Sequence, residues 1–385
     1  MANTGWASRT FGVALGAVCV SVGVVGSAGA QDSFTPLETL GEALFHDVNL
    51  SQSRSQSCAT CHDPESGFAD PRGMASPSHD FEAIGTRNAP TASYAALSPD
   101  FHRNADGQWV GGQFLDGRAI TLEEQAGGPP VNPVEMAMAD EATVVARLEE
   151  NPAYVTAFHE LFGADVFDAA DRAYEAMTQA LAAYERTEVF APFDSKYDRY
   201  LAGEAELSRE EQLGEALFFS PQFTNCHLCH QINTRPGAPR ETFTNYEYFN
   251  IGVPVNPDLR AMNGTEGAPA DAGLAENPLA QGDENQGRFK VPTLRNVAVT
   301  GPYMHNGVFE DLRTVVLFYN RYNTNADAAQ INPETGEPWG AIPYEHTLAN
   351  EELTEGDALS DREIDALVAF MKTLTDARYE YLLDE

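Results

Sequence analysis

The sequence predicts a mainly α-helical protein with long loops and little β structure. Apolar residues recur at helical spacing in several segments, and one helical hexapeptide occurs twice. Stretches rich in Gly, Pro and Asn separate these segments, notably residues 231–288, in which the acidic 263–287 segment is expected to be a solvated loop. With 385 residues, 43% of them hydrophobic, the chain can form one large domain or two ordinary ones.

Three helices are predicted with particular clarity. Residues 141–150 have helical periodicity and end at an Asn-Pro pair. Residues 169–187 place Tyr and Met among apolar residues on one face. Ser360 and Glu363 form a capping-box pattern, which opens a last helix over residues 364–374.

The amino terminus is typical of a secretory signal peptide. Arg9 precedes an apolar run over residues 11–26, and Ala28-Gly29-Ala30 supplies small residues for cleavage before Gln31. An uncleaved anchor helix is the alternative, although the run is short for a bilayer span. No later stretch is apolar enough to span. We therefore expect residues 1–30 to be removed and the protein to be periplasmic, without stable membrane insertion.

The charge balance excludes one class of partner. Asp and Glu outnumber Lys and Arg by 58 to 23, and no contiguous basic patch occurs. Nucleic acid is therefore not an expected partner. An acidic surface attracts cations and basic proteins instead.

Four cysteines remain beyond the predicted signal peptide, in two Cys-x-x-Cys-His motifs. These are Cys58, Cys61 and His62, and Cys226, Cys229 and His230. This motif attaches haem c through two thioethers, and its His is placed to bind the iron. Two disulfides or a zinc site are the alternatives, but neither requires a His after both pairs. We therefore predict two covalent haem c groups.

The hexapeptide Leu-Gly-Glu-Ala-Leu-Phe precedes both motifs, at residues 40–45 and 213–218. We interpret this as one helix-then-haem module used twice. Coincidence between two amphipathic helices is the alternative. The repeat divides the mature chain into residues 31–195 and 196–385, with the boundary near 190–206.

Further motifs resemble those of the bacterial dihaem cytochrome c peroxidase / MauG family over essentially the whole mature chain. Besides the two haem motifs, they are Arg87–Thr91, Gly112–Ala119, Leu122–Ala126, Asn132–Met136, Val291–Asn296 and Gly301–Gly307. The resemblance implies two cytochrome c-like domains, each with one haem c. It also implies that the amino-terminal haem meets peroxide and the carboxy-terminal haem handles electrons.

The resemblance identifies Gln113 and Glu123 as the pair beside bound peroxide. Cleavage of the O–O bond needs a group that moves a proton between the two oxygens. Glu123 lies ten residues after Gln113 and matches the family spacing better than Glu124. In an apolar pocket, burial would raise the pKa of Glu123. A surface Glu beside a surface Gln is the alternative.

The sixth ligand of the second haem is the most informative question. Ordinary family peroxidases use a Met fourteen residues after the His that corresponds to His305, and Tyr319 occupies that position here. MauG-like members have Tyr there. A phenolate favours oxidised iron and lowers the reduction potential, whereas a thioether raises it. Met304 is the fallback ligand, and a core tyrosine is the alternative for Tyr319.

The family also holds a calcium ion between the haems. Its ligands match the side chain of Asn88 and the carbonyl groups of Thr300 and Pro302, and oxygen ligands suit this hard cation. A turn Asn and a Pro-containing loop are the alternatives.

Three family features match less well. Arg103 occupies the position of the inter-haem Trp, so Trp109 is the nearest relay candidate. His79 lies at the distance of a His that caps the first haem in ordinary peroxidases, but a solvent-exposed loop His is the alternative. The surface Trp that precedes the second haem motif of MauG corresponds to Thr224, beside Phe223.

The resemblance thus implies an exported enzyme that uses hydrogen peroxide and oxidises a partner protein through a high-valent dihaem state. A peroxidase that takes electrons from a small cytochrome c or cupredoxin is the first alternative. A non-catalytic dihaem electron carrier is the second, although a carrier has no need of the Gln113 and Glu123 pair.

Overall fold

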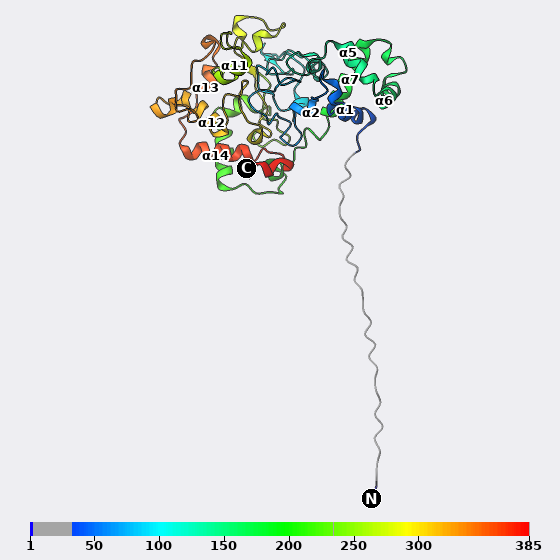
Figure 1. Ribbon diagram of the computed structural model, residues 1–385. Coiled ribbons are helices and arrows are strands. Elements are labelled where there is room, and N and C mark those ends of the chain that lie inside the picture. Colours follow the sequence, from blue (N-terminus) through cyan, green and yellow to red (C-terminus); the bar gives the residue numbers. More distant parts are fainter. Residues whose placement is uncertain (3–32, 234, 385) are drawn as a thin grey trace. The chain divides into compact units, whose positions relative to one another are not determined.

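The computed structural model describes residues 1–2, 33–233 and 235–384. The chain divides into two compact units, Met1–Phe34 and Thr35–Glu385. The predicted signal peptide, Met1 and Ala2 apart, lies outside the described residues. None of the helices in the described ranges is long and apolar enough to cross a membrane. All the elements below belong to the second unit (Figure 1).

The second unit is mainly helical with little strand, as predicted. Its α-helices are α1 (Pro36–Phe45), α2 (Cys58–Cys61), α3 (Leu122–Ala126), α4 (Gly128–Val131), α5 (Glu141–Glu149), α6 (Pro152–Phe162), α7 (Ala170–Glu185), α8 (Lys196–Leu201), α9 (Arg209–Phe218), α10 (Cys226–Cys229), α11 (Pro257–Asn263), α12 (Leu312–Asn320), α13 (Asn350–Thr354) and α14 (Asp361–Lys372). The three helices predicted most clearly correspond to α5, α7 and α14 and are confirmed. The division at residue 195 stays a prediction.

Polar residues set the starts of the principal helices. Thr35 before α1 and Ser208 before α9 each form a capping box with the Glu three residues later. Ser360 does the same before α14, since its backbone N–H donates to Glu363 at 2.8 Å. Each box satisfies backbone N–H groups that the first helical turn leaves unpaired. Both copies of the repeated hexapeptide therefore form the end of a helix, α1 or α9, that begins with a capping box.

The repeated hexapeptide has a packing function that its glycine explains. In α1, a Cβ on Gly41 would lie 2.0 Å from the carbonyl oxygen of Ala180 in α7. In α9, a Cβ on Gly214 would lie 1.9 Å from the carbonyl oxygen of Ala366 in α14. Only glycine permits helix backbones to approach so closely. The two copies thus make the same crossing with two different partner helices.

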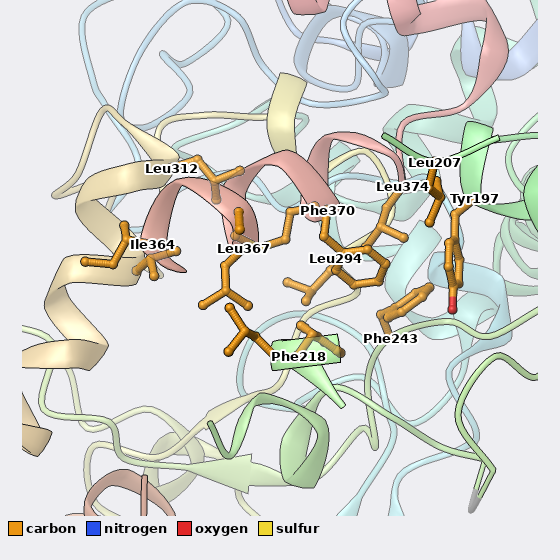
Figure 2. Close-up of a cluster of buried hydrophobic side chains, with 14 residues drawn as sticks. Tyr197, Leu207, Phe218, Phe243, Leu294, Leu312, Ile364, Leu367, Phe370 and Leu374 are labelled. Atoms are coloured by element: carbon orange, nitrogen blue, oxygen red, sulfur yellow. The ribbon is translucent and has the colours of Figure 1, made fainter. Parts of the chain in front are cut away.

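A hydrophobic cluster surrounds the crossing of α9 and α14 (Figure 2). Phe218 from α9 and Ile364, Leu367 and Phe370 from α14 point into it, together with Phe243 from a loop. Phe370 is fully buried and lies 5.3 Å from Phe218 and 6.2 Å from Phe243 between ring centroids. Burial of such rings contributes most of the hydrophobic stabilisation here.

The strands form two short antiparallel ribbons. β1 (His102–Arg103) pairs with β2 (Trp109–Val110), and β3 (Tyr248–Phe249) pairs with β4 (Phe289–Lys290). Val110 also bridges Glu247, so the two ribbons adjoin.

The prediction that residues 263–287 form a solvated loop is wrong in part. Leu274 is 1% exposed and packs on Phe101 and Tyr248, because the loop covers the ribbon aromatics. Asp271 accepts two hydrogen bonds from Arg87, at 2.6 and 2.7 Å. The acidic residues of this segment therefore pair with the partly buried Arg87 as well as face solvent.

The close helix crossing generates a testable prediction. Gly214→Ala forces α9 away from α14, and we expect it to lower the free energy of unfolding by at least about 1–3 kcal/mol. Thermal or denaturant unfolding followed by circular dichroism measures the change. Gly267→Ala is the matched control, because nothing lies within 4 Å of its added Cβ. Equal stability of the two variants would contradict the proposed packing function.

Candidate functional site

Each Cys-x-x-Cys-His motif folds as one helical turn. α2 carries Cys58 and Cys61, and α10 carries Cys226 and Cys229, with the His at the C-cap in both cases. Residues three apart in a helical turn lie on one face, so both thiols of a pair point the same way. The four thiols form no disulfide. Within the described part of the chain, no three His, Cys, Asp or Glu residues cluster as metal ligands.

Both motif histidines have the same orientation. Nδ1 of His62 lies 3.3 Å from the carbonyl oxygen of Phe68, and Nδ1 of His230 lies 3.1 Å from that of Phe243. Burial lowers the pKa of His62 and lowers that of His230 to about 4. Each ring is therefore neutral and donates through Nδ1. Nε2 is left as the lone-pair nitrogen, which is the arrangement of a metal-binding histidine.

A cavity of about 870 Å³ adjoins the second motif. Cys226, Cys229 and His230 line it, and Tyr319 of α12 and Met304 line it as well. The cavity wall is mostly apolar and the cavity is large enough for a tetrapyrrole, so the donor set and the space both fit a haem. The structure thus brings both predicted sixth-ligand candidates to the same cavity.

Gln113 lies at the wall of this cavity. Its side chain is 6% exposed, and its Nε2 donates to the carbonyl oxygen of Ala95 at 3.1 Å. Its backbone N–H donates to Ala119, which closes the tight Gly112–Ala119 loop. The amide oxygen of Gln113 remains the end of the side chain available to a ligand.

Glu123 differs from the prediction. The Arg186 guanidinium binds both of its carboxylate oxygens, at 2.6 and 3.0 Å. This pairing lowers the pKa of Glu123 instead of raising it, because the side chain is 32% exposed and its charge is compensated. The expected raised pKa is therefore wrong. A raised pKa is found instead at Glu185 of α7, where burial of the carboxyl group raises the pKa to about 8.

The residues of the predicted calcium site all belong to the lining of the large cavity. Asn88, Thr300 and Pro302 all line it. The backbone N–H of Asn88 donates to the carbonyl oxygen of His305 at 2.8 Å, which fixes this segment against the 300–305 loop. The segment at Asn88 therefore contacts the loop that carries Thr300 and Pro302, and calcium binding there stays a prediction.

Trp109 lies away from the large cavity. Arg103 and Trp109 are direct cross-strand partners, and the Arg103 guanidinium lies 4.3 Å from the Trp109 ring. The other face of the ring stacks on Phe101, with centroids 4.7 Å apart. Trp109 lines a separate cavity of about 210 Å³. The structure therefore does not bring Trp109 to the wall that Tyr319 and Gln113 share.

His79 is not a solvent-exposed loop residue. Its side chain is 12% exposed, its Nε2 lies 3.7 Å from Asp80, and its Nδ1 is buried without a hydrogen-bond partner. Its function as a cap stays a prediction.

Thr224 is buried and donates to the carbonyl oxygen of Leu217 at 2.6 Å. The neighbouring Phe223 is 42% exposed and also lines the large cavity. Leu228 and Ile232, on the other side of Cys226, are 44% and 53% exposed. Exposed apolar side chains thus flank the second haem motif.

Sequence reasoning missed three contributors. Arg186 and Glu185 end α7, and no local motif links them to Glu123, which is more than sixty residues away in the chain. Tyr94 also lines the large cavity, and its hydroxyl contacts Asp376, close to the carboxyl terminus. Such contacts depend on the tertiary fold.

Comparisons with known proteins show the family of this chain. A family model described as Di-haem cytochrome c peroxidase matches residues 36–206. The methylamine utilization protein MauG of Paracoccus denitrificans is 52% identical over 94% of this chain and 95% of its own length. Cytochrome c peroxidase Ccp of Escherichia coli is 33% identical over 76% of this chain and 54% of its own length. The crystal structure of the diheme peroxidase BthA from Burkholderia thailandensis has a TM-score of 0.80 at 32% identity, over 90% of this chain and 87% of that one. The chain therefore belongs to the di-haem cytochrome c peroxidase family, as a MauG-like dihaem oxidoreductase.

Proposed function

We propose that the protein is an exported, periplasmic enzyme that uses hydrogen peroxide to oxidise a partner protein. Its two cytochrome c-like domains, residues 31–195 and 196–385, would each hold one covalent haem c. Cys58 and Cys61 would attach the first, and Cys226 and Cys229 the second. When bound, the two haem irons supply the capacity to accept and store oxidising equivalents.

Tyr319 is the residue that favours oxidation of a partner protein over simple reduction of peroxide. It belongs to α12 and lines the same cavity as His230, and it would bind the iron of the second haem together with that histidine. An anionic phenolate favours the oxidised iron, so a haem held by His230 and Tyr319 is a poor store of reducing electrons. Such a ligand set suits oxidation of a partner better than reduction of peroxide by stored electrons.

Glu123 and Gln113 would handle the peroxide. Because Arg186 keeps Glu123 ionised, its carboxylate is ready to take the proton from the inner oxygen of hydrogen peroxide. Glu123 then returns that proton to the outer oxygen, which leaves as water. Gln113 would hold the peroxide by its side-chain amide. Because Arg186 keeps Glu123 ionised, Glu123 would act as a base in the first proton transfer and as an acid in the second.

The oxygens of Asn88, Thr300 and Pro302 would hold one calcium ion, completed by water. Calcium takes six to eight oxygen ligands in flexible geometry, which suits one side chain and two carbonyl groups of an irregular loop. The ion would fix the loop between the two haem sites.

The partner would approach the second haem motif. Phe223, Leu228 and Ile232 offer exposed apolar contacts around Cys226, which is typical of the centre of a docking surface. A formal net charge of −35 favours a basic partner protein or donor.

One experiment separates this function from the main alternative. The fully ferric protein is mixed with one equivalent of hydrogen peroxide, without a donor, and the Soret and near-infrared absorption is followed. We expect both haems to change at once. If the protein reacts only after half-reduction, it is a peroxidase supplied by a small cytochrome c or cupredoxin, with His79 as the cap. No reaction in any redox state would favour an electron carrier.

Glu123 generates a second prediction. We expect Glu123→Gln to slow the reaction of the ferric protein with peroxide by roughly 10²–10⁴-fold, because the amide cannot relay the proton. Stopped-flow absorption measures the rate. Glu124→Gln is the matched control, because Glu124 only accepts the backbone N–H of Ile120 at 2.7 Å. Similar rates in the two variants would exclude Glu123 as the proton-transfer group.

Tyr319 generates a third prediction. We expect Tyr319→Met to raise the reduction potential of the second haem by on the order of 100 mV, since a thioether favours Fe(II) and axial ligands set potentials over about 0.8 V. A spectroelectrochemical titration measures the potential. Met304→Leu should leave it unchanged. The opposite pattern would identify Met304 as the ligand.

A further inference from the structure

Tyr94 lies on a segment that connects the two candidate haem sites. The carbonyl oxygen of Phe68 contacts Nδ1 of His62 and also accepts the backbone N–H of Ala92, two residues before Tyr94. The carbonyl oxygen of Ala95, directly after Tyr94, accepts the side-chain amide of Gln113. The segment is therefore held on both sides by residues predicted to serve the first haem.

The same residue belongs to the site of the second haem. Tyr94 lines the 870 Å³ cavity together with His230 and Tyr319, and it is 2% exposed. Trp109, the relay candidate from the sequence, does not line this cavity and is paired with a guanidinium instead. Of these two residues, Tyr94 is thus the one that lines the second site on a segment bonded to the first.

The hydroxyl of Tyr94 has a buried proton acceptor. It donates to Oδ1 of Asp376 at 2.6 Å, and it accepts the backbone N–H of Phe193 at 3.2 Å. Asp376 is fully buried. The Asn296 side chain donates from Nδ2 to Oδ2 of Asp376 and accepts the backbone N–H of Asp376 at its Oδ1, both at 2.8 Å. Burial raises the pKa of Asp376 and so makes its carboxylate a stronger base.

The backbone of Tyr94 is in an unfavourable conformation. Its φ of 60° and ψ of 2° lie in the left-handed region, which a bulky residue adopts at a cost of about 1 kcal/mol or more. Asn, Asp or Gly would fit this turn with less strain. A tyrosine occupies this strained position, and its hydroxyl donates to a carboxylate.

We propose that Tyr94 relays electrons between the two haem sites, with Asp376 as its proton acceptor. This inference rests on the proposed function, in which peroxide oxidises the first site. Tyr94 gives one electron to the oxidised site at His62, its O–H bond breaks, and the proton passes to Oδ1 of Asp376. One electron from the site at His230 then reduces the Tyr94 oxygen, and Asp376 returns the proton. The net result is one electron moved from the second site to the first.

Arg295 limits the lifetime of the oxidised tyrosine. Its guanidinium lies 5.4 Å from the Tyr94 ring and is itself paired with Asp198. A nearby cation disfavours loss of an electron, so oxidised Tyr94 is rapidly reduced again. Transfer of the proton to Asp376 keeps the positive charge away from the phenol oxygen. The arrangement suits a relay instead of a storage site.

The test compares Tyr94→Phe and Asp376→Asn with the unsubstituted holoenzyme. Ferric protein is mixed with peroxide in H₂O and in D₂O, and the two haems are followed separately by stopped-flow absorption. In both variants we expect the first haem to react at its normal rate and the change of the second haem to be at least about tenfold slower. We also expect Tyr94→Phe to abolish the solvent isotope effect of that second step.

Two controls separate relay from packing. Tyr379→Phe removes a phenol that is equally buried but donates to the carbonyl oxygen of Pro64, which cannot accept a proton. A fluorinated tyrosine at position 94 keeps the shape and changes the redox chemistry of the phenol. Equal slowing by Tyr379→Phe, or an unchanged rate with the fluorinated residue, would overturn the relay. Unchanged rate and isotope effect in Tyr94→Phe would do the same.

Failure of the proposed function is distinguishable. If the ferric protein is inert to peroxide, photo-oxidation by a soluble ruthenium complex supplies the oxidising equivalent, and rapid-freeze EPR detects tyrosyl radical. A radical signal that is lost in Tyr94→Phe but kept in Tyr379→Phe supports the relay. No tyrosyl signal in the unsubstituted protein overturns it.

Discussion

The backbone contact between paired helices is the constraint on which the rest of the structure depends. Gly41 lets α1 touch α7, and Gly214 lets α9 touch α14. Each capped helix is followed by a one-turn helix with two cysteines and a histidine. Each crossing therefore anchors the helix that precedes a haem motif. Because α7 also carries Glu185 and Arg186, the same crossing positions the partner of Glu123.

Buried cations join the segments between the two helix pairs. Arg87 bonds to Asp271 and Glu276 from the later part of the chain and to Asp116 from the earlier part. Arg295 is 1% exposed and pairs with Asp198. Removing one partner of such a pair leaves an uncompensated buried charge, which is strongly destabilising. These ion pairs hold the segment around Tyr94 and the predicted calcium loop in a single arrangement.

The fold and part of the site could be predicted from the sequence because they rest on local patterns. Capping boxes, helical periodicity and Cys-x-x-Cys-His turns each involve residues only a few positions apart, so α5, α7, α14 and both haem motifs were predictable. The charge state of Glu123 was not, because Arg186 lies more than sixty residues away. The position of Trp109 was not predictable either, since a two-stranded ribbon pairs it with Arg103. Likewise, the composition of residues 263–287 predicts a solvated loop, because the contact with the distant Arg87 cannot be read from the sequence.

Burial of some of the few basic residues also affects the surface charge that a partner protein would encounter. With 23 bases against 58 acids, each buried cation leaves the surface more acidic. Lys290 illustrates this, because its ammonium group is buried against the carbonyl oxygen of Gly112 and burial lowers its pKa to about 8. The repulsion among surface carboxylates is screened by salt over about 8 Å at physiological ionic strength. In the proposed function, electrostatic attraction would bring a basic partner to many faces of the protein. The exposed apolar side chains of Phe223, Leu228 and Ile232, near Cys226 in the chain, would then set where this partner binds, since apolar contacts are insensitive to salt.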